Sequence, residues 1–172
     1  MNSLNVNPAR KFQNFYELLS PRELGRGAAA KKDLSVHVVT STPLGIAVSG
    51  ALVIPRPGVI IAFLDLCFDQ LDRFQISWSE ANGHTYIYYY NGLLADYEIL
   101  DIGINAKQPI LTHDYLLDGT NTVLAYLKDS KPTYRLQAER FSIEYVWADE
   151  VANAITAFGY GLKTNSIQLI LN

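Results

Sequence analysis

Few side chains in this sequence have the types and the spacing that catalysis requires. His113-Asp114, taken together with Asp101, is the closest approach to a general acid–base pair, but these residues are equally those of a polar turn with solvated carboxylates. Cys67 lies in the apolar run LDLCFDQL, which favours an inert core thiol over a nucleophile. We therefore expect the protein not to be an enzyme.

Metal and phosphate chemistry have equally little support. Asp65, Asp69 and Asp72 have the spacing of one helix face, which is compatible with a divalent ion but is most simply a solvated surface. The three histidines lack the spacing of zinc ligands. The GRG of ELGRGAAAKK lacks the Gly-Lys-Ser/Thr ending of a phosphate-binding loop. The sequence predicts neither a metal nor a cofactor.

The most unusual stretch is HTYIYYYNG, residues 84–92, in which four tyrosines precede Asn91-Gly92. Its alternation favours a hydrophobic core wall made of Tyr86, Tyr88 and Tyr90 with their hydroxyls at the rim. The same three residues are candidates for a subunit interface, where tyrosine is enriched. A sugar-binding platform is the third interpretation, and it requires ring faces exposed on a flat surface.

The elements that position these tyrosines follow from the turn. Asn-Gly between two β-rich runs predicts a two-residue type I′ hairpin, which places Tyr90 opposite Leu93, Tyr88 opposite Ala95 and Tyr86 opposite Tyr97. After Ile99 the apolar parity shifts, and a bulge near Leu100-Asp101 accommodates the shift. Bulged strands of this kind suit a barrel or a strongly bent sandwich.

The rest of the chain from residue 33 is predicted to be mostly strands. Turns are expected at residues 42–45 and 128–132, with one strand over 45–55, a hairpin over 109–127 and a long strand over 133–147. Two helices are predicted as well. Val59–Phe63 continues as a short helix with Leu64, Cys67, Phe68 and Leu71 on one face, and Asp149 caps a helix with Val151, Ala154, Ile155 and Phe158 on one face. SIQLILN closes the chain as a strand.

The first 32 residues differ from the body. Phe12, Phe15, Tyr16 and Leu19 fall on one face of a predicted helix that Ser20-Pro21 ends. Ser20, Pro21 and Glu23 also have the types of a capping box for a second short helix, but Gly25 and Gly27 weaken it, so GRGAAAKK is predicted to be a flexible tether. An isolated amphipathic helix is stable only when its apolar face is docked. The four residues on the apolar face of the first helix are therefore candidate interface residues, and the sequence leaves open whether they dock in cis or on another subunit.

The charge is divided in the same way. Residues 1–32 carry six basic and two acidic side chains, whereas residues 33–172 carry eight basic and fifteen acidic ones. A basic arm on an acidic body favours docking of the arm on its own body or on a neighbouring subunit. The acidic body repels nucleic acid, so we expect any contact with nucleic acid to be indirect.

Length and composition set the class of protein. The chain of 172 residues has 49% hydrophobic and 18% charged residues, which is a globular composition for one domain. A single cysteine excludes an intrachain disulfide and favours assembly in a reducing cytosol. The N-terminus MNSLNVNPARKF has no apolar stretch typical of a signal peptide, and the longest apolar run, GVIIAFL, is too short for a membrane span.

These features predict a mainly β (α+β) protein: a bulged antiparallel β-sandwich or barrel over 33–172, with one C-terminal helix and a helical N-terminal arm over 1–32. In this general architecture the chain resembles virion structural proteins of tailed bacteriophages, of the tail-tube or baseplate-ring type. The resemblance implies a non-enzymatic protein that assembles in the host cytoplasm with itself and with other virion proteins into rings, with no membrane contact. It transfers no functional residue.

Two other classes of protein remain open. One is a small viral coat protein with a β jelly-roll body and a basic arm that faces nucleic acid. The other is a stand-alone binding module or small enzyme with a cleft beside the tyrosines that holds His84 or His113.

Overall fold

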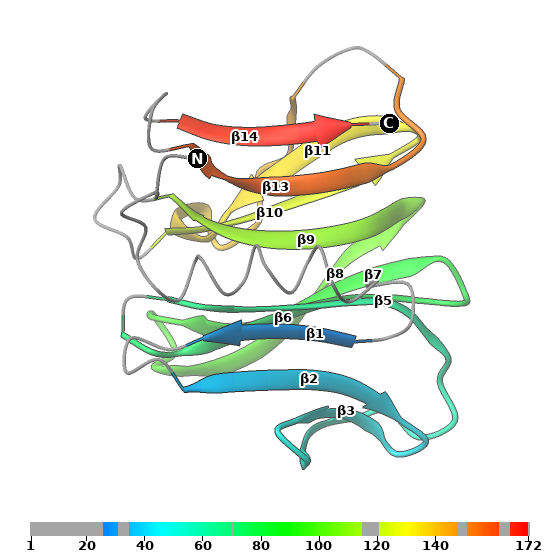
Figure 1. Ribbon diagram of the computed structural model, residues 1–172, viewed down its shortest axis with the longest axis vertical. Coiled ribbons are helices and arrows are strands. Elements are labelled where there is room, and N and C mark those ends of the chain that lie inside the picture. The colour runs from blue at the N-terminus through cyan, green and yellow to red at the C-terminus, as the bar shows by residue number, and fades with distance from the viewer. Residues whose placement is uncertain are drawn as a thin grey trace, which may run out of the picture.

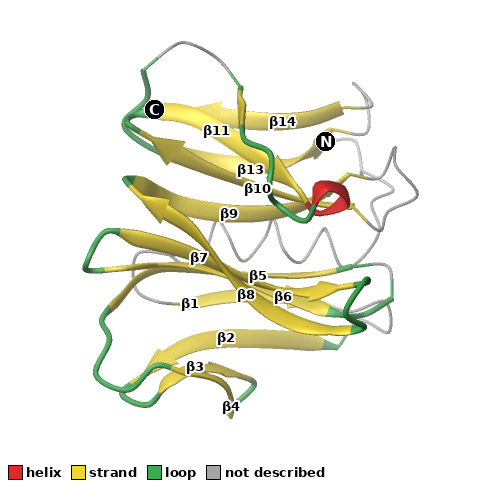
Figure 2. Ribbon diagram, turned by 180° about the vertical axis from the view of Figure 1, so that it is seen from behind, coloured by secondary structure: helices red, strands yellow, loops and turns green. Residues whose placement is uncertain are grey.

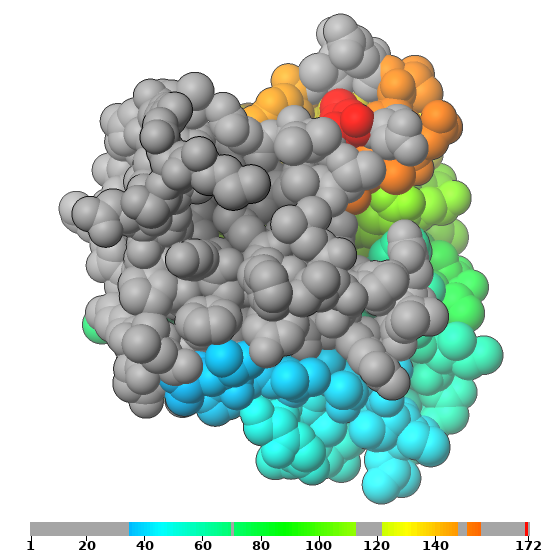
Figure 3. Space-filling model, in the orientation of Figure 1, coloured from blue at the N-terminus to red at the C-terminus, as the bar shows by residue number. Residues whose placement is uncertain are grey.

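The computed structural model describes residues 26–30, 35–69, 71–114, 121–147, 151–161 and 166–171. These residues are mainly β and form four antiparallel sheets, called A to D here. The sheets are stacked in layers along the long axis, with A at one end, B in the middle, and C and D at the other end (Figures 1 and 2). In the space-filling view, β2 and β3 accordingly lie at the opposite end from the C-terminal segments (Figure 3).

Sheet A is a meander of four strands in chain order. Its strands are β1 (Arg26–Ala30), β2 (Val36–Thr42), β3 (Gly45–Val48) and β4 (Ala51–Pro55). The predicted turn at residues 42–45 is present, because Thr42 pairs with Gly45 around Pro43-Leu44. The single strand predicted over 45–55 is wrong. Ser49 and Gly50 both have positive φ and make a second tight turn that separates β3 from β4.

Sheet B is the central layer and is also a meander. Its strands are β5 (Ile61–Phe68), β6 (Phe74–Glu80), β7 (His84–Asn91) and β8 (Asp96–Ile104). The predicted helix after Phe63 is wrong, since residues 61–68 are one strand. Its apolar residues run almost continuously because β5 is covered on both faces, and such a run is easily mistaken for a helix face.

Sheet C contains β9 (Ala106–Asp114), β10 (Asn121–Lys128), β11 (Lys131–Leu136) and β12 (Tyr145–Val146), in the order β12-β11-β10-β9. The hairpin predicted over 109–127 is confirmed, and Asp129-Ser130, both with positive φ, form the predicted turn at 128–132. The long strand predicted over 133–147 is interrupted by a 3₁₀ turn, Gln137–Glu139, followed by left-handed Arg140 and Phe141. That turn accounts for the parity change in the sequence.

Sheet D consists of β13 (Ile155–Gly161) and β14 (Ser166–Leu171). The predicted closing strand is thus confirmed, but the predicted C-terminal helix is wrong. Residues 151–154 are irregular, and Ala152 donates its backbone N–H to the Ser130 carbonyl. The Gln108 side chain accepts from the Ile155 amide at 2.9 Å and donates to the Asn153 carbonyl at 3.4 Å, which ties this segment to β9 instead.

The predicted arm is only partly described. Residues 1–25, with Phe12, Phe15, Tyr16 and Leu19, lie outside the described residues. Arg26–Ala30, predicted as part of a flexible tether, instead form β1 and pair along their whole length with Val36–Thr40 of β2. This part of the arm therefore belongs to sheet A.

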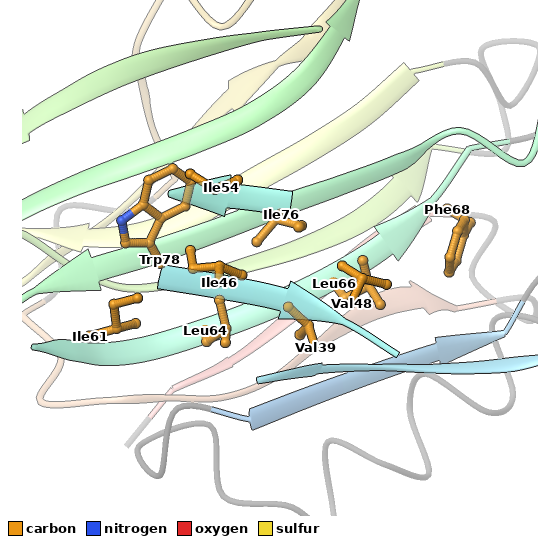
Figure 4. Close-up of a cluster of buried hydrophobic side chains, with 10 residues drawn as sticks. All are labelled: Val39, Ile46, Val48, Ile54, Ile61, Leu64, Leu66, Phe68, Ile76 and Trp78. Carbon is orange, nitrogen blue, oxygen red and sulfur yellow. The ribbon is translucent and has the colours of Figure 1, made fainter. Parts of the chain in front are cut away.

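The core lies in separate layers between the sheets. Between A and B, Ile46, Val48 and Ile54 pack against Leu66 and Trp78, with the other members of the cluster around them (Figure 4). A second cluster joins B to C, and a third lies between C and D. Sheet B therefore has a hydrophobic core on each face, one shared with sheet A and one shared with sheet C, and its tyrosines lie on both of these faces.

Candidate functional site

The three candidate tyrosines lie on the face of sheet B that points toward sheet A. Burial alternates along β7: Tyr86, Tyr88 and Tyr90 are half-buried, whereas Thr85, Ile87, Tyr89 and Asn91 are buried against sheet C. Both faces are covered, but the predicted inner face is the more exposed of the two. The three tyrosines predicted to form a wall therefore lie on the face of sheet B that is covered only in part.

The hairpin register differs from the prediction by four residues. Asn91 pairs with Asp96, so Gly92–Ala95 form a four-residue loop and Tyr88 lies opposite Ile99. The Asn91 side chain explains the longer loop, because its Oδ1 accepts from the Leu93 amide at 3.0 Å and its amide donates to Glu98 at 2.9 Å. An even shift leaves the side-chain parity intact, so the three tyrosines still share one face. The predicted bulge is present at Ile102, where the register steps from Tyr86–Asp101 to Thr85–Gly103.

The aromatic rings on this face stack on one another. Tyr88 stacks on Tyr97 at 4.9 Å between ring centroids, and Tyr97 stacks on Phe74 at 5.0 Å. Trp78 stacks on Tyr86 at 5.3 Å. Because ring faces are occupied by neighbouring rings, this surface presents ring edges and hydroxyls. Such an arrangement disfavours a sugar platform, which needs open ring faces.

Arg56 closes one end of the aromatic row. Its guanidinium lies 4.9 Å from the Tyr86 ring and 5.8 Å from the Trp78 ring, within cation–π range of both. Its Nε lies 3.6 Å from Glu80, a buried carboxylate that also accepts from the Trp78 indole at 3.1 Å. Through these contacts Arg56, the residue that follows β4 in the sequence, is held against the surface of sheet B.

His84 and Asp101 form a pair beside the aromatic row. His84 Nδ1 lies 2.9 Å from Asp101 Oδ2, and Asp101 Oδ1 accepts from the Gly103 amide at 2.8 Å. The His84 ring is also 6.1 Å from Tyr86. Sequence spacing associated Asp101 with His113-Asp114, whereas in the structure Asp101 pairs with His84, beside the predicted bulge.

A groove opens where the two sheets end side by side. It has a volume of about 450 Å³, its floor is Tyr86 and Tyr88, and its walls are Val53–Arg56 from one sheet and Ile99 and Asp101 from the other. In the described chain, β4 is hydrogen-bonded only to β3, and β8 only to β7. The groove therefore lies between two edge strands, and we call it the aromatic groove.

The phenols of the groove remain hydrogen-bond donors across the usual pH range. Burial, followed by the charge of Glu80, raises the pKa of Tyr86, and burial followed by Asp96 raises the pKa of Tyr88. For Tyr97, which does not line the groove but stacks on Tyr88, burial and the nearby Asp69 raise the pKa to about 12. Neutral hydroxyls at this rim suit contacts with backbone and polar groups of a partner.

The structure also places most of the other residues that the sequence suggested for catalysis or metal binding. Cys67 is buried in the core between B and C. Asp65 accepts from the Leu111 amide at 2.7 Å, and Asp69 holds the turn to Arg73 with an ion pair of 2.6 Å, so the predicted solvated helix face is wrong. Within the described ranges no three potential ligands lie close enough to hold a metal ion. The side chain of His113 is not described.

Comparisons with protein-family models, with curated proteins and with solved structures find no match for this chain. Among the described residues, no helix has the length and apolar character needed to cross a bilayer. The aromatic groove and the edges of the sheets are thus the features from which a function is argued.

Proposed function

We propose that this protein is a non-enzymatic structural protein whose copies assemble into rings or shells, as a component of a tailed-bacteriophage virion of the tail-tube or baseplate type. The observation that carries the proposal is the aromatic groove between the two edge strands β4 and β8. The virion assignment itself extends the resemblance in architecture, and it places assembly in the host cytoplasm.

The groove has the composition of a protein-binding surface. Tyrosine and arginine are enriched in such surfaces, and here Tyr86, Tyr88 and Arg56 meet within one groove. Beside them in the groove, Ile99 of β8 is 44% exposed, and Val53 of β4 is half-buried. A partner that covers these side chains removes apolar surface from water at about 25 cal/mol per Å².

The two sides of the sandwich formed by A and B differ. On one side β1 lies against β5, so the two sheets meet (Figure 1). On the other side β4 and β8 are separated by the groove. A contact that joins one side of a copy to the other side of the next is heterologous, and repeated heterologous contacts close into rings or continue as tubes.

The charge of β8 argues against pairing of two identical groove sides. Residues 93–106 contain Asp96, Glu98 and Asp101 and no lysine or arginine. Two copies of this strand placed edge to edge bring carboxylates together, a device by which natural edge strands avoid self-pairing. The arrangement favours a partner surface of different chemistry, as a head-to-tail ring requires.

The test is the absolute mass of the full-length protein, measured by light scattering over a range of concentrations, with negative-stain images of the same fractions. Assembly predicts a defined multiple of 19.2 kDa and visible rings, tubes or shells. A mass of one chain at every concentration contradicts the proposal. The virion assignment is tested separately, by finding the protein in purified phage particles.

A stand-alone binding module is the second candidate, because the groove volume of about 450 Å³ lies in the range of small-molecule sites, roughly 300–1,000 Å³. His84 and Asp101 at one wall are the polar groups that such a ligand would meet. This alternative predicts a monomer whose thermal stability rises in a ligand screen and does not rise for the Tyr88→Ala variant.

A further inference from the structure

We infer that the aromatic groove of one copy is the acceptor for the aromatic N-terminal segment, residues 12–19, of a second copy. This inference rests on the proposed function and names the contact through which the copies assemble. Three observations lead to it: the chemistry of the two surfaces, their charges, and the position at which the N-terminal segment joins the sandwich.

The chemistry of the two surfaces is complementary. The groove offers tyrosine ring edges and hydroxyls from β7 together with apolar Val53 and Ile99. The N-terminal segment carries four large apolar or aromatic side chains within eight residues, namely Phe12, Phe15, Tyr16 and Leu19. Aromatic residues packed edge to face add about 0.5–1.5 kcal/mol per pair beyond the burial of their surface.

The charges are complementary as well. Two charged side chains line the groove, Arg56 and Asp101, and Arg56 already lies against Glu80 and the Tyr86 ring. Residues 1–16 carry Arg10 and Lys11 and no carboxylate, and these two cations immediately precede Phe12. Asp101, at the groove wall with its side chain 47% exposed, is available to a cation of this segment. A second copy of β8 lacks this complementarity, because it would bring its own carboxylates to the groove.

The position of the segment favours docking between copies. The segment precedes β1 in the sequence by six residues, and β1 pairs with β2 and lies against β5. The groove lies beyond β7, between β8 and β4, at the opposite side of the same two sheets. Strand β1, the first described element after the segment, and the groove therefore occupy opposite sides of the sandwich, which suits a head-to-tail contact between copies.

The experiment uses the full chain with a photoreactive benzoyl-phenylalanine in place of Phe15. This chain is mixed with an equal amount of ¹⁵N-labelled wild-type chain, dissociated by dilution, reconcentrated and irradiated, and the cross-linked peptides are identified by mass spectrometry. The inference predicts cross-links from the unlabelled segment to labelled groove residues, within 53–56, 86–88 or 99–101. A parallel sample with the photoreactive residue at Ile143, which is exposed on another surface, is predicted to give none of these cross-links.

A second variant tests the acceptor. Ile99→Asp in the labelled chain adds a buried charge at the contact and is expected to lower the yield of these cross-links by about tenfold or more, since each 1.4 kcal/mol is a factor of ten. Ile143→Asp is the matched control and is expected to leave the yield unchanged. Circular dichroism of both variants checks that the fold is retained.

The outcomes separate this inference from the proposed function. Cross-links confined to one chain show docking in cis and overturn the inference. Cross-links between copies that map elsewhere, in a protein that assembles, overturn the inference and leave the proposed function standing. A protein that stays monomeric overturns both. Occupation of the groove by a ligand of another class also overturns the inference. In that case the groove residues are shielded from solvent, but the protein gives no cross-links from the N-terminal segment to the groove.

Discussion

The two faces of sheet B contain similar residues but are covered differently. On the face toward sheet C, Tyr89 is 1% exposed and packs edge to face on Phe141, at 4.9 Å between ring centroids. On the opposite face, Tyr88 stacks on Tyr97 at almost the same distance but remains half-buried. The same hairpin therefore has one face that is fully covered, called the finished face here, and one face that is covered only in part.

The finished face is held by polar contacts as well as by packing. Strand β9 crosses it, and its backbone accepts from the Thr85 hydroxyl at Ala106 and donates to Asp65 at Leu111. Strand β9 is an edge strand of sheet C, and these two side chains provide hydrogen-bond partners for backbone groups that sheet C leaves unpaired. Strands β4 and β8 have no such cover in the described chain. The β9 edge is thus covered by side chains of sheet B, whereas the β4 and β8 edges are uncovered among the described residues.

The largest expected effect comes from truncating a ring on the finished face. Tyr89→Ala removes a buried ring and its hydrogen bond to Glu98, and we expect a loss of about 3–5 kcal/mol in the free energy of unfolding. Tyr90→Ala, on the half-buried face of the same strand, is the matched control with an expected loss of about 1–2 kcal/mol. Urea denaturation measures both. Equal losses would mean that the two faces are equally complete.

The next effect concerns Arg135, which joins sheet C to sheet B. Its guanidinium donates to the Tyr126 hydroxyl at 2.8 Å, to the Ile102 carbonyl of β8 at 3.3 Å and to Glu144 at 3.0 Å. Arg135→Met removes the donor to the Ile102 carbonyl and to the Tyr126 hydroxyl and one of the three donors to Glu144, and we expect destabilisation of about 2–4 kcal/mol. Arg140→Met, at an exposed arginine, is expected to change the stability by less than about 1 kcal/mol. Similar values for both would contradict this role of Arg135.

A smaller effect appears on acidification. Burial alone raises the pKa of Glu144, but hydrogen bonds from Lys128, Tyr126 and Arg135 outweigh it and lower the pKa from 4.5 to about 2. A depressed folded-state pKa stabilises the protein above the unfolded value, and this contribution is lost as the pH falls from about 4.5 to about 2.

At about 1.4 kcal/mol per pKa unit the shift corresponds to at most about 3.5 kcal/mol, and because Glu144 is partly exposed, screening by solvent reduces the expected contribution to about 1–2 kcal/mol. We expect Glu144→Gln to flatten the fall in stability over this pH window, measured by urea denaturation at closely spaced pH values. A pH dependence identical to that of the wild type would show that Glu144 does not carry the effect.

The smallest effect on stability, with the largest effect on assembly, is expected at the groove. Ile99→Asp replaces a side chain that is 44% exposed, so the stability should change by less than about 1 kcal/mol. The same change places a charge in the proposed contact, and the mass measured by light scattering should fall to that of one chain. Ile143→Asp, at a residue that is 47% exposed outside the groove, should leave the mass unchanged. Loss of assembly in both variants would point to general surface charge instead.

Local turn chemistry was predictable from the sequence. The turns at Pro43-Leu44 and Asp129-Ser130 and the closing strand follow from residue types alone. In the tyrosine hairpin, parity was predictable because it alternates along the strand, but the register was not. The Asn91 side chain is used to cap a longer loop, and nothing in the pair Asn-Gly distinguishes that use from a two-residue turn.

Helices and the groove were not predictable for a different reason. Apolar spacing around Leu64 and Cys67 matches a helix face, but burial of β5 on both sides produces the same pattern. The segment after Asp149 was predicted to be helical, whereas Gln108, more than forty residues earlier, holds its backbone in an irregular conformation. The aromatic groove combines β4, β7 and β8, and its walls meet only after the sheets pack.

The most direct test of the difference between the two sides is amide hydrogen exchange of the full-length protein, at a concentration that favours assembly and after dilution to single chains. The account predicts that amides of β8 and β4 are protected in the assembly and exchange faster after dilution, whereas amides of β9 and β10 are protected equally in both samples. Protection of β8 that does not depend on concentration would contradict the claim that the groove side is completed by a second copy.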